Sequence, residues 1–178
     1  NQQMNIVIEE IGKMLYQQWF VDFEFPNNEG NPYRTSGGKM IFDDDLGIEI
    51  PKDWEINPIH KFGKILCGKT PPKSNKEFFD GDVPFIKIPD MHSQLFITHT
   101  NDTLTEKGNN YQENKTVPAG SICVSCIATV GLVSITSKKS HTNQQINSII
   151  PQDKQFRNYL YYVMKSMKDD LNNMGSGG

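Results

Sequence analysis

One segment of this sequence matches the phosphate-binding loop of nucleotide-binding proteins letter for letter. Gly63 to Thr70 has the order G-x-x-x-x-G-K-T, in which backbone N–H groups and a following helix would hold a phosphate. Pro71 and Pro72 follow at once, and they remove two N–H donors and force Thr70 away from helical geometry. We therefore reject nucleotide binding, and we expect no cofactor.

The sulfur and imidazole side chains do not form a metal site by their spacing. Cys123 and Cys126 make a C-x-x-C, but a strand places residues three apart on opposite faces, and no second Cys pair completes a tetrahedral zinc site. The four histidines show no i,i+4 pairing. We expect core thiols and no bound metal.

A weak carboxylate pattern leaves one catalytic alternative open. Pro89 and Asp90, with Glu113 and Lys115, resemble the P-D…E-x-K of magnesium nucleases, in which the lysine assists the attacking water. Such a Glu and Lys belong on a buried strand, whereas Tyr111 to Thr116 (YQENKT) is typical of a polar loop. A magnesium-dependent nuclease is kept as an alternative, and the sequence favours a binding protein without catalytic residues.

Composition and charge indicate a globular protein with two different surfaces. The 178 residues are 36% hydrophobic and include ten Phe, six Tyr and two Trp, too many for a disordered chain. Residues 1–57 hold four Lys/Arg against eleven Asp/Glu, whereas residues 58–178 hold fourteen against ten. The net charges of −7 and +4 suggest that the second part could face a polyanion.

The chain shows no sign of membrane insertion or of secretion. No apolar run approaches the ~18 residues that would span a bilayer. Three cysteines, an odd number, do not form a disulfide framework and suit a reducing compartment. We expect a cytoplasmic protein.

The apolar periodicity predicts a helix at each end of the chain and a β-rich domain between them. Residues 3–20 form one amphipathic stripe, and Phe156 to Met174 form another, with Asp153 as its N-cap. Residues 26–50 are rich in turn formers and predict an irregular linker. Long loops are expected over 68–82 and 92–116, and a hairpin turn at Thr129 to Gly131. The strands are expected at 83–88, 122–128, 132–136 and 146–150. The fold class is α+β.

The order of several short motifs resembles the specificity subunit of type I restriction-modification systems. Leu15 to Pro26 (LYQQWFVDFEFP) is similar to the exit of that family's spacer helix. The motifs that follow it in family order are Ile50, Pro51 and Trp54 for I-P-x-x-W; Gly68, Thr70 and Pro71 for G-x-T-P; Gly81 to Ile86 (GDVPFI) for G-x-I-P-W-I, with Phe85 in place of Trp; Asp90; Pro118, Gly120, Ser121 and Ile122 for P-x-G-[ST]-I; Thr129 and Gly131 for T-x-G; and Asn143 and Gln144 for N-Q.

The resemblance implies a division into three parts and a function. Residues 1–25 would be the end of a conserved spacer helix, 26–50 a linker, and 51–178 a target recognition domain. The family's distal helical stretch is absent, so we expect a half-subunit or a fragment. The implied function is recognition of one half of a split DNA target. Methyl transfer and cleavage would belong to modification and restriction subunits, the latter reached through the former. A protein-interaction module without DNA affinity is the other alternative.

The candidate binding residues fall into two groups. Lysines are expected to neutralise phosphates, while Asn, Gln, Ser, Thr and His reach base edges. The DNA-binding candidates are Lys69, Thr70, Lys73, Ser74, Asn75, Lys76, Lys87, His92, Ser93, Gln94, Lys138 and Lys139. Asn143 and Gln144 could serve recognition or structure alone. The stripe expected to dock a modification subunit is Met4, Val7, Ile8, Ile11, Met14 and Leu15.

Overall fold

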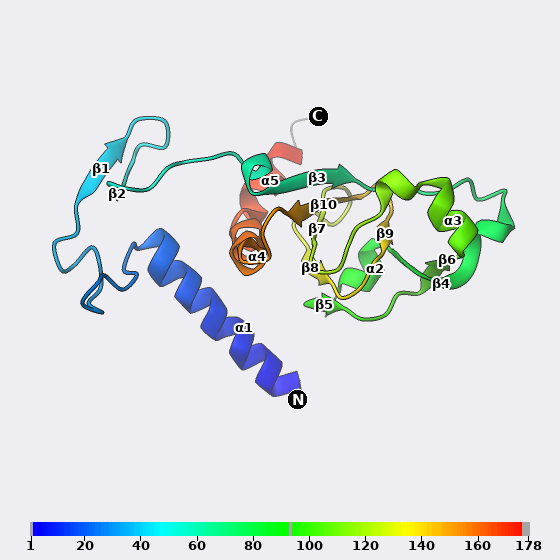
Figure 1. Ribbon diagram of the computed structural model, residues 1–178, viewed down its shortest axis with the longest axis horizontal. Helices are drawn as coiled ribbons and strands as arrows, with labels where there is room; N and C mark the ends of the chain where they lie inside the picture. The colour runs from blue at the N-terminus through cyan, green and yellow to red at the C-terminus, as the bar shows by residue number, and fades with distance from the viewer. Residues whose placement is uncertain (1, 93, 176–178) are drawn as a thin grey trace. The chain divides into compact units, whose positions relative to one another are not determined.

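The computed structural model describes residues 2–92 and 94–175, and it divides the chain into two compact units. The units are Asn1–Asn57 and Pro58–Gly178 (Figure 1). Helices and strands alternate irregularly along the chain, so the predicted α+β class is confirmed. No helix in the described ranges combines the length and the apolar character that crossing a membrane requires.

The first unit consists of a helix and a small hairpin joined by an aromatic cluster. Helix α1 (Gln2–Tyr16) continues into a π-helical turn, Gln17–Val21, so the predicted helix over 3–20 is confirmed. Strands β1 (Met40–Asp43) and β2 (Ile48–Pro51) pair antiparallel. The expectation of an irregular segment up to Pro51 is therefore wrong for residues 40–51. The three-part division at 25/26 and 50/51 stays a prediction.

Aromatic rings hold the exit of the helix in this unit. Phe25 lies 4.6 Å from Tyr33 and 5.2 Å from Trp54 between ring centroids, and Phe23 meets Trp54 edge-on at 5.5 Å. Phe23 is buried and has a positive φ of 60°. The chain thus turns sharply out of the helix where these rings gather.

The second unit contains a five-stranded and a three-stranded sheet. The first has the order β3 (Gly63–Cys67), β10 (Ile146–Pro151), β7 (Ile122–Ser125), β8 (Val133–Thr136) and β5 (Phe96–Ile97). The second has the order β6 (Asp102–Leu104), β4 (Phe79–Ile86) and β9 (His141–Thr142). Pairs β5–β8 and β4–β9 are parallel and the others antiparallel, so the sheets are mixed.

Short helices and strands occupy about half of what the sequence suggested were long loops. The region 68–82 contains a 3₁₀ turn, Lys76–Phe78, and the start of β4. The region 92–116 contains β5, β6, helix α3 (Glu106–Tyr111) and a 3₁₀ turn, Glu113–Lys115. A further 3₁₀ turn, Ile59–Lys61, precedes β3, and a short helix α2 (Ile88–Met91) follows β4. The prediction of long irregular loops is therefore wrong, because elements of two to six residues carry too little periodicity to be recognised.

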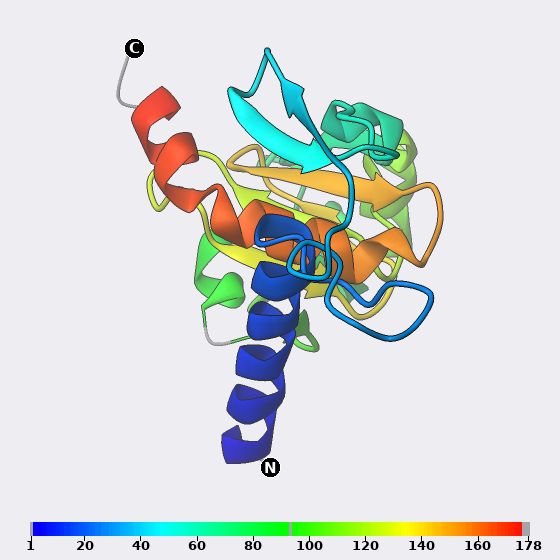
Figure 2. The ribbon, with the colours of Figure 1, turned by 90° about the vertical axis from the view of Figure 1, so that its left-hand side faces the viewer.

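The C-terminal stripe covers one face of the five-stranded sheet. Helix α4 (Phe156–Ser166) packs on β7 and β8 (Figure 2). It buries Leu160, Tyr161 and Met164. The single predicted helix is split at Met167, and α5 (Lys168–Gly175) follows. Asp153 accepts the Gln155 N–H at 2.9 Å, one turn before the helix begins. The predicted N-cap is therefore wrong in position, although the carboxylate still satisfies a donor of the entry turn.

The two cysteines of the C-x-x-C face opposite sides of the sheet, as the strand period predicts, with Cys123 in β7 and Cys126 just after its end. Cys123 belongs to one apolar cluster with Ile86 and Ile146, and Cys126 packs against the other, on the side of α4. Burial raises the pKa of the Cys123 thiol to about 12, so it stays protonated and unreactive at neutral pH.

Candidate nucleic-acid interface

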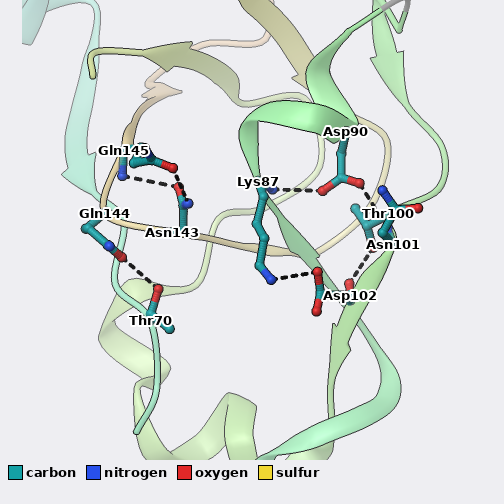
Figure 3. A network of polar contacts seen from close by, with 9 residues as sticks. All are labelled: Thr70, Lys87, Asp90, Thr100, Asn101, Asp102, Asn143, Gln144 and Gln145. Atoms are coloured by element: carbon teal, nitrogen blue, oxygen red, sulfur yellow. Dashed lines mark hydrogen bonds and ion pairs between the residues drawn. The ribbon is translucent and has the colours of Figure 1, made fainter. Parts of the chain in front are cut away.

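Three segments that are distant in sequence converge at one end of the β-rich unit. Because β9 runs parallel to β4, both strands end at the same edge, and the Asn143 N–H donates to the Ile86 carbonyl at 3.1 Å. The segment after β3 joins them, since the Lys69 N–H donates to the Thr142 carbonyl at 2.9 Å. Figure 3 shows the polar side chains that gather there.

A glycine makes this convergence possible. A Cβ on Gly68 would lie 2.0 Å from the Asn143 carbonyl oxygen and 2.4 Å from Thr142 Oγ1, far inside van der Waals contact. Gly68 therefore allows two backbones to approach, and the following Lys69 and Thr70 lie in no helix. This geometry explains the glycine of the G-x-T-P motif and agrees with the rejection of a phosphate loop.

The N-Q motif separates into a structural and an exposed half. Asn143 is buried and closes its own turn, because its Oδ1 accepts the Gln145 N–H at 3.1 Å and its Nδ2 donates to Gln145 Oε1 at 2.9 Å. Gln144 is exposed, and its Oε1 accepts the Thr70 hydroxyl at 2.7 Å (Figure 3). Asn143 therefore shapes the loop, whereas the Thr70–Gln144 pair faces outward.

A second polar group surrounds Lys87. The buried Asp90 carboxylate accepts the Lys87 N–H at 2.8 Å and the Asn101 N–H at 2.9 Å, so it caps α2 and fixes the neighbouring loop. The Lys87 ammonium donates to Asp102 Oδ2 at 2.6 Å. Its Nζ also lies 5.5 Å from the centroid of the Phe85 ring.

The nuclease pattern is used for structure in this fold. Both oxygens of Asp90 bind backbone donors, and Lys115 donates to the Cys67 carbonyl at 3.1 Å. Glu113 and Lys115 lie in a 3₁₀ turn instead of a buried strand. In residues 2–92 and 94–175, no three His, Cys, Asp or Glu side chains gather in a way that could hold a metal ion.

The segment 72–76 presents its polar side chains to solvent. Lys73, Ser74, Asn75 and Lys76 are all exposed. The buried Phe78 anchors the segment on α3, with its ring centroid 4.8 Å from that of Tyr111. Lys69 Nζ lies 5.9 Å from the same Tyr111 ring. Lys69 and the segment that carries Lys73 and Lys76 therefore both pack against the Tyr111 ring.

The loop after α2 places its three candidates differently. His92 is exposed, and Ser93 lies outside the described residues. Gln94 Nε2 donates to the carbonyls of Asp90 and His99, at 2.7 and 3.2 Å, and its Oε1 accepts the Thr98 N–H at 3.1 Å. Because the loop itself occupies both ends of the Gln94 amide, its geometry favours a structural role over base reading.

Lys138 and Lys139 are exposed but leave the five-stranded sheet at the other end. They follow the last residue of β8, whereas Gly68 leaves β3 at the end where β8 begins. An open groove of about 620 Å³, lined by Ser137, Lys154 and Arg157 among others, lies on that side. The structure therefore does not place this pair beside Lys73 and Lys76.

A buried polar cluster around His141, which no pattern in the sequence indicated, supports the Lys69 segment. His141 is fully buried, and Gln112 Nε2 lies 3.3 Å from its Nδ1 and 2.9 Å from the Lys69 carbonyl. With Nδ1 as the acceptor, His141 Nε2–H donates to Asn109 Oδ1 at 3.0 Å. Burial, with the nearby Lys139 charge, lowers the pKa of His141 to about 4. The imidazole is neutral at pH 7, and no sequence spacing connects these residues.

The six apolar candidates for partner binding share one helix and are all exposed. Their exposed fractions lie between 42% for Leu15 and 65% for Met14. The other four residues of the stripe are Met4, Val7, Ile8 and Ile11. Exposed apolar faces of this kind are uncommon on the surface of a folded protein.

Comparisons with known proteins agree with one another. Residues 51–178 match the family described as "Type I restriction modification DNA specificity domain". The chain is 44% identical to the type I restriction enzyme HindI specificity subunit of Haemophilus influenzae, over all of this chain and 49% of that protein. It is 33% identical to the MjaIX specificity subunit of Methanocaldococcus jannaschii, over 75% of this chain and 32% of that protein. The chain thus spans half or less of the length of these relatives.

A solved structure shares the fold. The HsdS subunit from Thermoanaerobacter tengcongensis superposes with a TM-score of 0.61 at 17% identity, over 97% of this chain and 38% of that one.

Proposed function

The chain belongs to the family of type I restriction-modification specificity subunits, and we propose that it reads one half-site of a bipartite DNA target. The observation that carries this proposal is the family match over residues 51–178, which contains the polar convergence at Gly68 to Thr70, Lys87 and Asn143 to Gln145. Recognition is a property of the surface, so no catalytic residue of this chain is required.

The proposed interface divides the work between charge and hydrogen bonding. Lys69, Lys73 and Lys76 contact phosphates, because they are exposed cations on two segments that pack against the same Tyr111 ring. Thr70 with Gln144, and Ser74, Asn75 and His92, face the base edges. Lys138 and Lys139 extend the phosphate contacts at the far end of the sheet. Ser93 remains a base-reading candidate from the sequence alone.

The exposed stripe of α1 is proposed to dock modification subunits, which would in turn bring the restriction subunit. Burial of its six apolar side chains would stabilise such a contact by roughly 25 cal/mol for each Å² removed from water. Methyl transfer and cleavage belong to those partners in this proposal, and the assembly acts in the cytoplasm.

The test is binding of duplex DNA to the modification complex assembled with this chain. From a pool of random duplexes, the complex should select a bipartite sequence in which one half is set by this chain. The affinity of the complex for DNA should fall steeply as the salt concentration rises. Magnesium-dependent cleavage by the purified chain alone would instead establish the nuclease. A complex that assembles but shows no DNA affinity attributable to this chain would establish an interaction module.

A further inference from the structure

Lys87 differs from the other candidate lysines in being held in place. Its backbone N–H is bound by Asp90, its ammonium by Asp102 at 2.6 Å, and its Nζ lies over the Phe85 ring. Lys73 and Lys76 stand exposed in an open segment. A phosphate contact tolerates a mobile side chain, whereas base reading needs a donor at a fixed position.

The charge around Lys87 disfavours a phosphate. Asp102 forms a pair with the ammonium whose net charge is zero, and the two side chains are 35% and 42% exposed. A phosphate that approached the ammonium would also approach the Asp102 carboxylate, and the repulsion would offset the attraction. Such a pair releases little condensed counterion, unlike a free surface lysine.

The pair nevertheless presents a donor beside an acceptor at the point of convergence. Ile86, the residue before Lys87, accepts the Asn143 N–H. The Lys87–Asp102 pair and the Thr70–Gln144 pair therefore both lie where the paired strands β4 and β9 end. In the major groove a G·C pair presents the guanine O6 and N7 acceptors next to the cytosine N4 amino donor. A lysine ammonium beside a carboxylate is complementary to that edge.

We propose that Lys87 is a base-reading residue that takes a guanine edge of a G·C pair, with Asp102 positioning its ammonium and accepting from the cytosine amino group. This inference rests on the proposed function and assigns to it a specificity determinant. It also reassigns Lys87, which the sequence suggested was a phosphate contact.

The test selects duplexes from a random pool with the assembled complex carrying wild type, Lys87→Gln or Asp102→Asn. The matched control is Lys107→Gln, because Lys107 forms an exposed ion pair with Glu77 at 2.7 Å in the same unit. We expect both interface variants to lose sequence preference at one G·C position and to bind the wild-type sequence roughly 5- to 150-fold more weakly. Binding to unrelated duplexes and the salt slope should stay at the values of wild type and control.

Two results would overturn this inference. One is a uniform loss of affinity on all sequences for Lys87→Gln, with a salt slope lower by about 0.9, which identifies a phosphate contact. The other is an unchanged selected sequence in both variants. A thermal unfolding curve for each variant excludes misfolding, and the Asp90 contact with the Lys87 backbone survives either change. If wild type itself selects no sequence, the proposed function fails, and that result is distinct from the other two.

Discussion

Helices α1 and α4 have the same kind of apolar stripe, but only one of them is covered by its own unit. Leu160, Tyr161 and Met164 of α4 are at most 5% exposed against the sheet. In α1, Ile11 is 50% exposed and Val7 52%. The second unit is therefore stabilised by its own helix, whereas the first leaves the apolar face of its helix exposed.

The two units also differ in how far along the chain their side-chain hydrogen bonds reach. Thr70 and Gln144 are 74 positions apart in the second unit, whereas Thr35 and Glu24 are 11 apart in the first unit and Arg34 and Glu49 are 15 apart. The first unit also has ring contacts around Trp54. We expect stability and DNA reading to reside in residues 58–178, and assembly in α1.

The largest expected effect is the loss of a core side chain from α4. Leu160→Ala should lower the free energy of unfolding by about 2–5 kcal/mol, because Leu160 is 1% exposed and its removal leaves a cavity. Ile11→Ala is the matched change on α1 and should lower the free energy of unfolding by less than ~0.5 kcal/mol, because Ile11 is exposed. Urea unfolding of both variants measures the difference, and equal losses would mean that α1 is covered as well.

Acid should act on the second unit through His141. Its pKa of about 4 lies below the ordinary value of 6.5, so the unfolded chain binds the proton more readily than the folded one. The full stability is present above pH 6.5 and falls by about 1.4 kcal/mol per pH unit down to about pH 4. Urea unfolding between pH 7 and 4.5 measures this slope. His141→Gln should remove the contribution of His141 to the pH dependence of the free energy of unfolding. An identical slope in that variant would contradict a buried neutral imidazole.

The free lysines should control the salt dependence of DNA binding. The double change Lys73→Ala and Lys76→Ala should weaken binding to all sequences alike and lower the salt slope by about 2. Lys39→Ala with Lys52→Ala, in the acidic first unit, should leave the slope unchanged. Titrations of the assembled complex at several salt concentrations decide. An unchanged slope in the first pair would mean that segment 72–76 faces away from DNA.

Charges on the exposed stripe of α1 should have the smallest effect on stability and the largest effect on assembly. Val7→Asp with Ile11→Asp should change the free energy of unfolding by less than ~0.5 kcal/mol, since both side chains are already exposed. Docking to a modification subunit should be abolished, because two charges would be buried without partners. Co-purification with that subunit measures docking, and a loss of several kcal/mol in urea would show that the stripe belongs to the fold.

The sequence predicted the elements whose pattern extends over several residues. The stripes of α1 and α4, the strands β7, β8 and β10 and the turn at Gly131 follow from periodicity and a positive φ. The hairpin at 40–51 and the short helices were missed because each is too short for its apolar pattern to repeat more than once or twice. The contacts of His141, Gln112 and Asn109, and the pairing of Lys87 with Asp102, depend on chain crossings that spacing does not encode.

An exchange between two proteins would show whether residues 58–178 read one half of the target. Residues 58–178 would replace the matching residues of the Haemophilus influenzae relative, and the bases methylated by the complex would be sequenced before and after the exchange. We expect one half of the methylated sequence to change while the other half stays the same. A methylated sequence that stays the same in both halves, from a complex that assembles and methylates DNA, would contradict it.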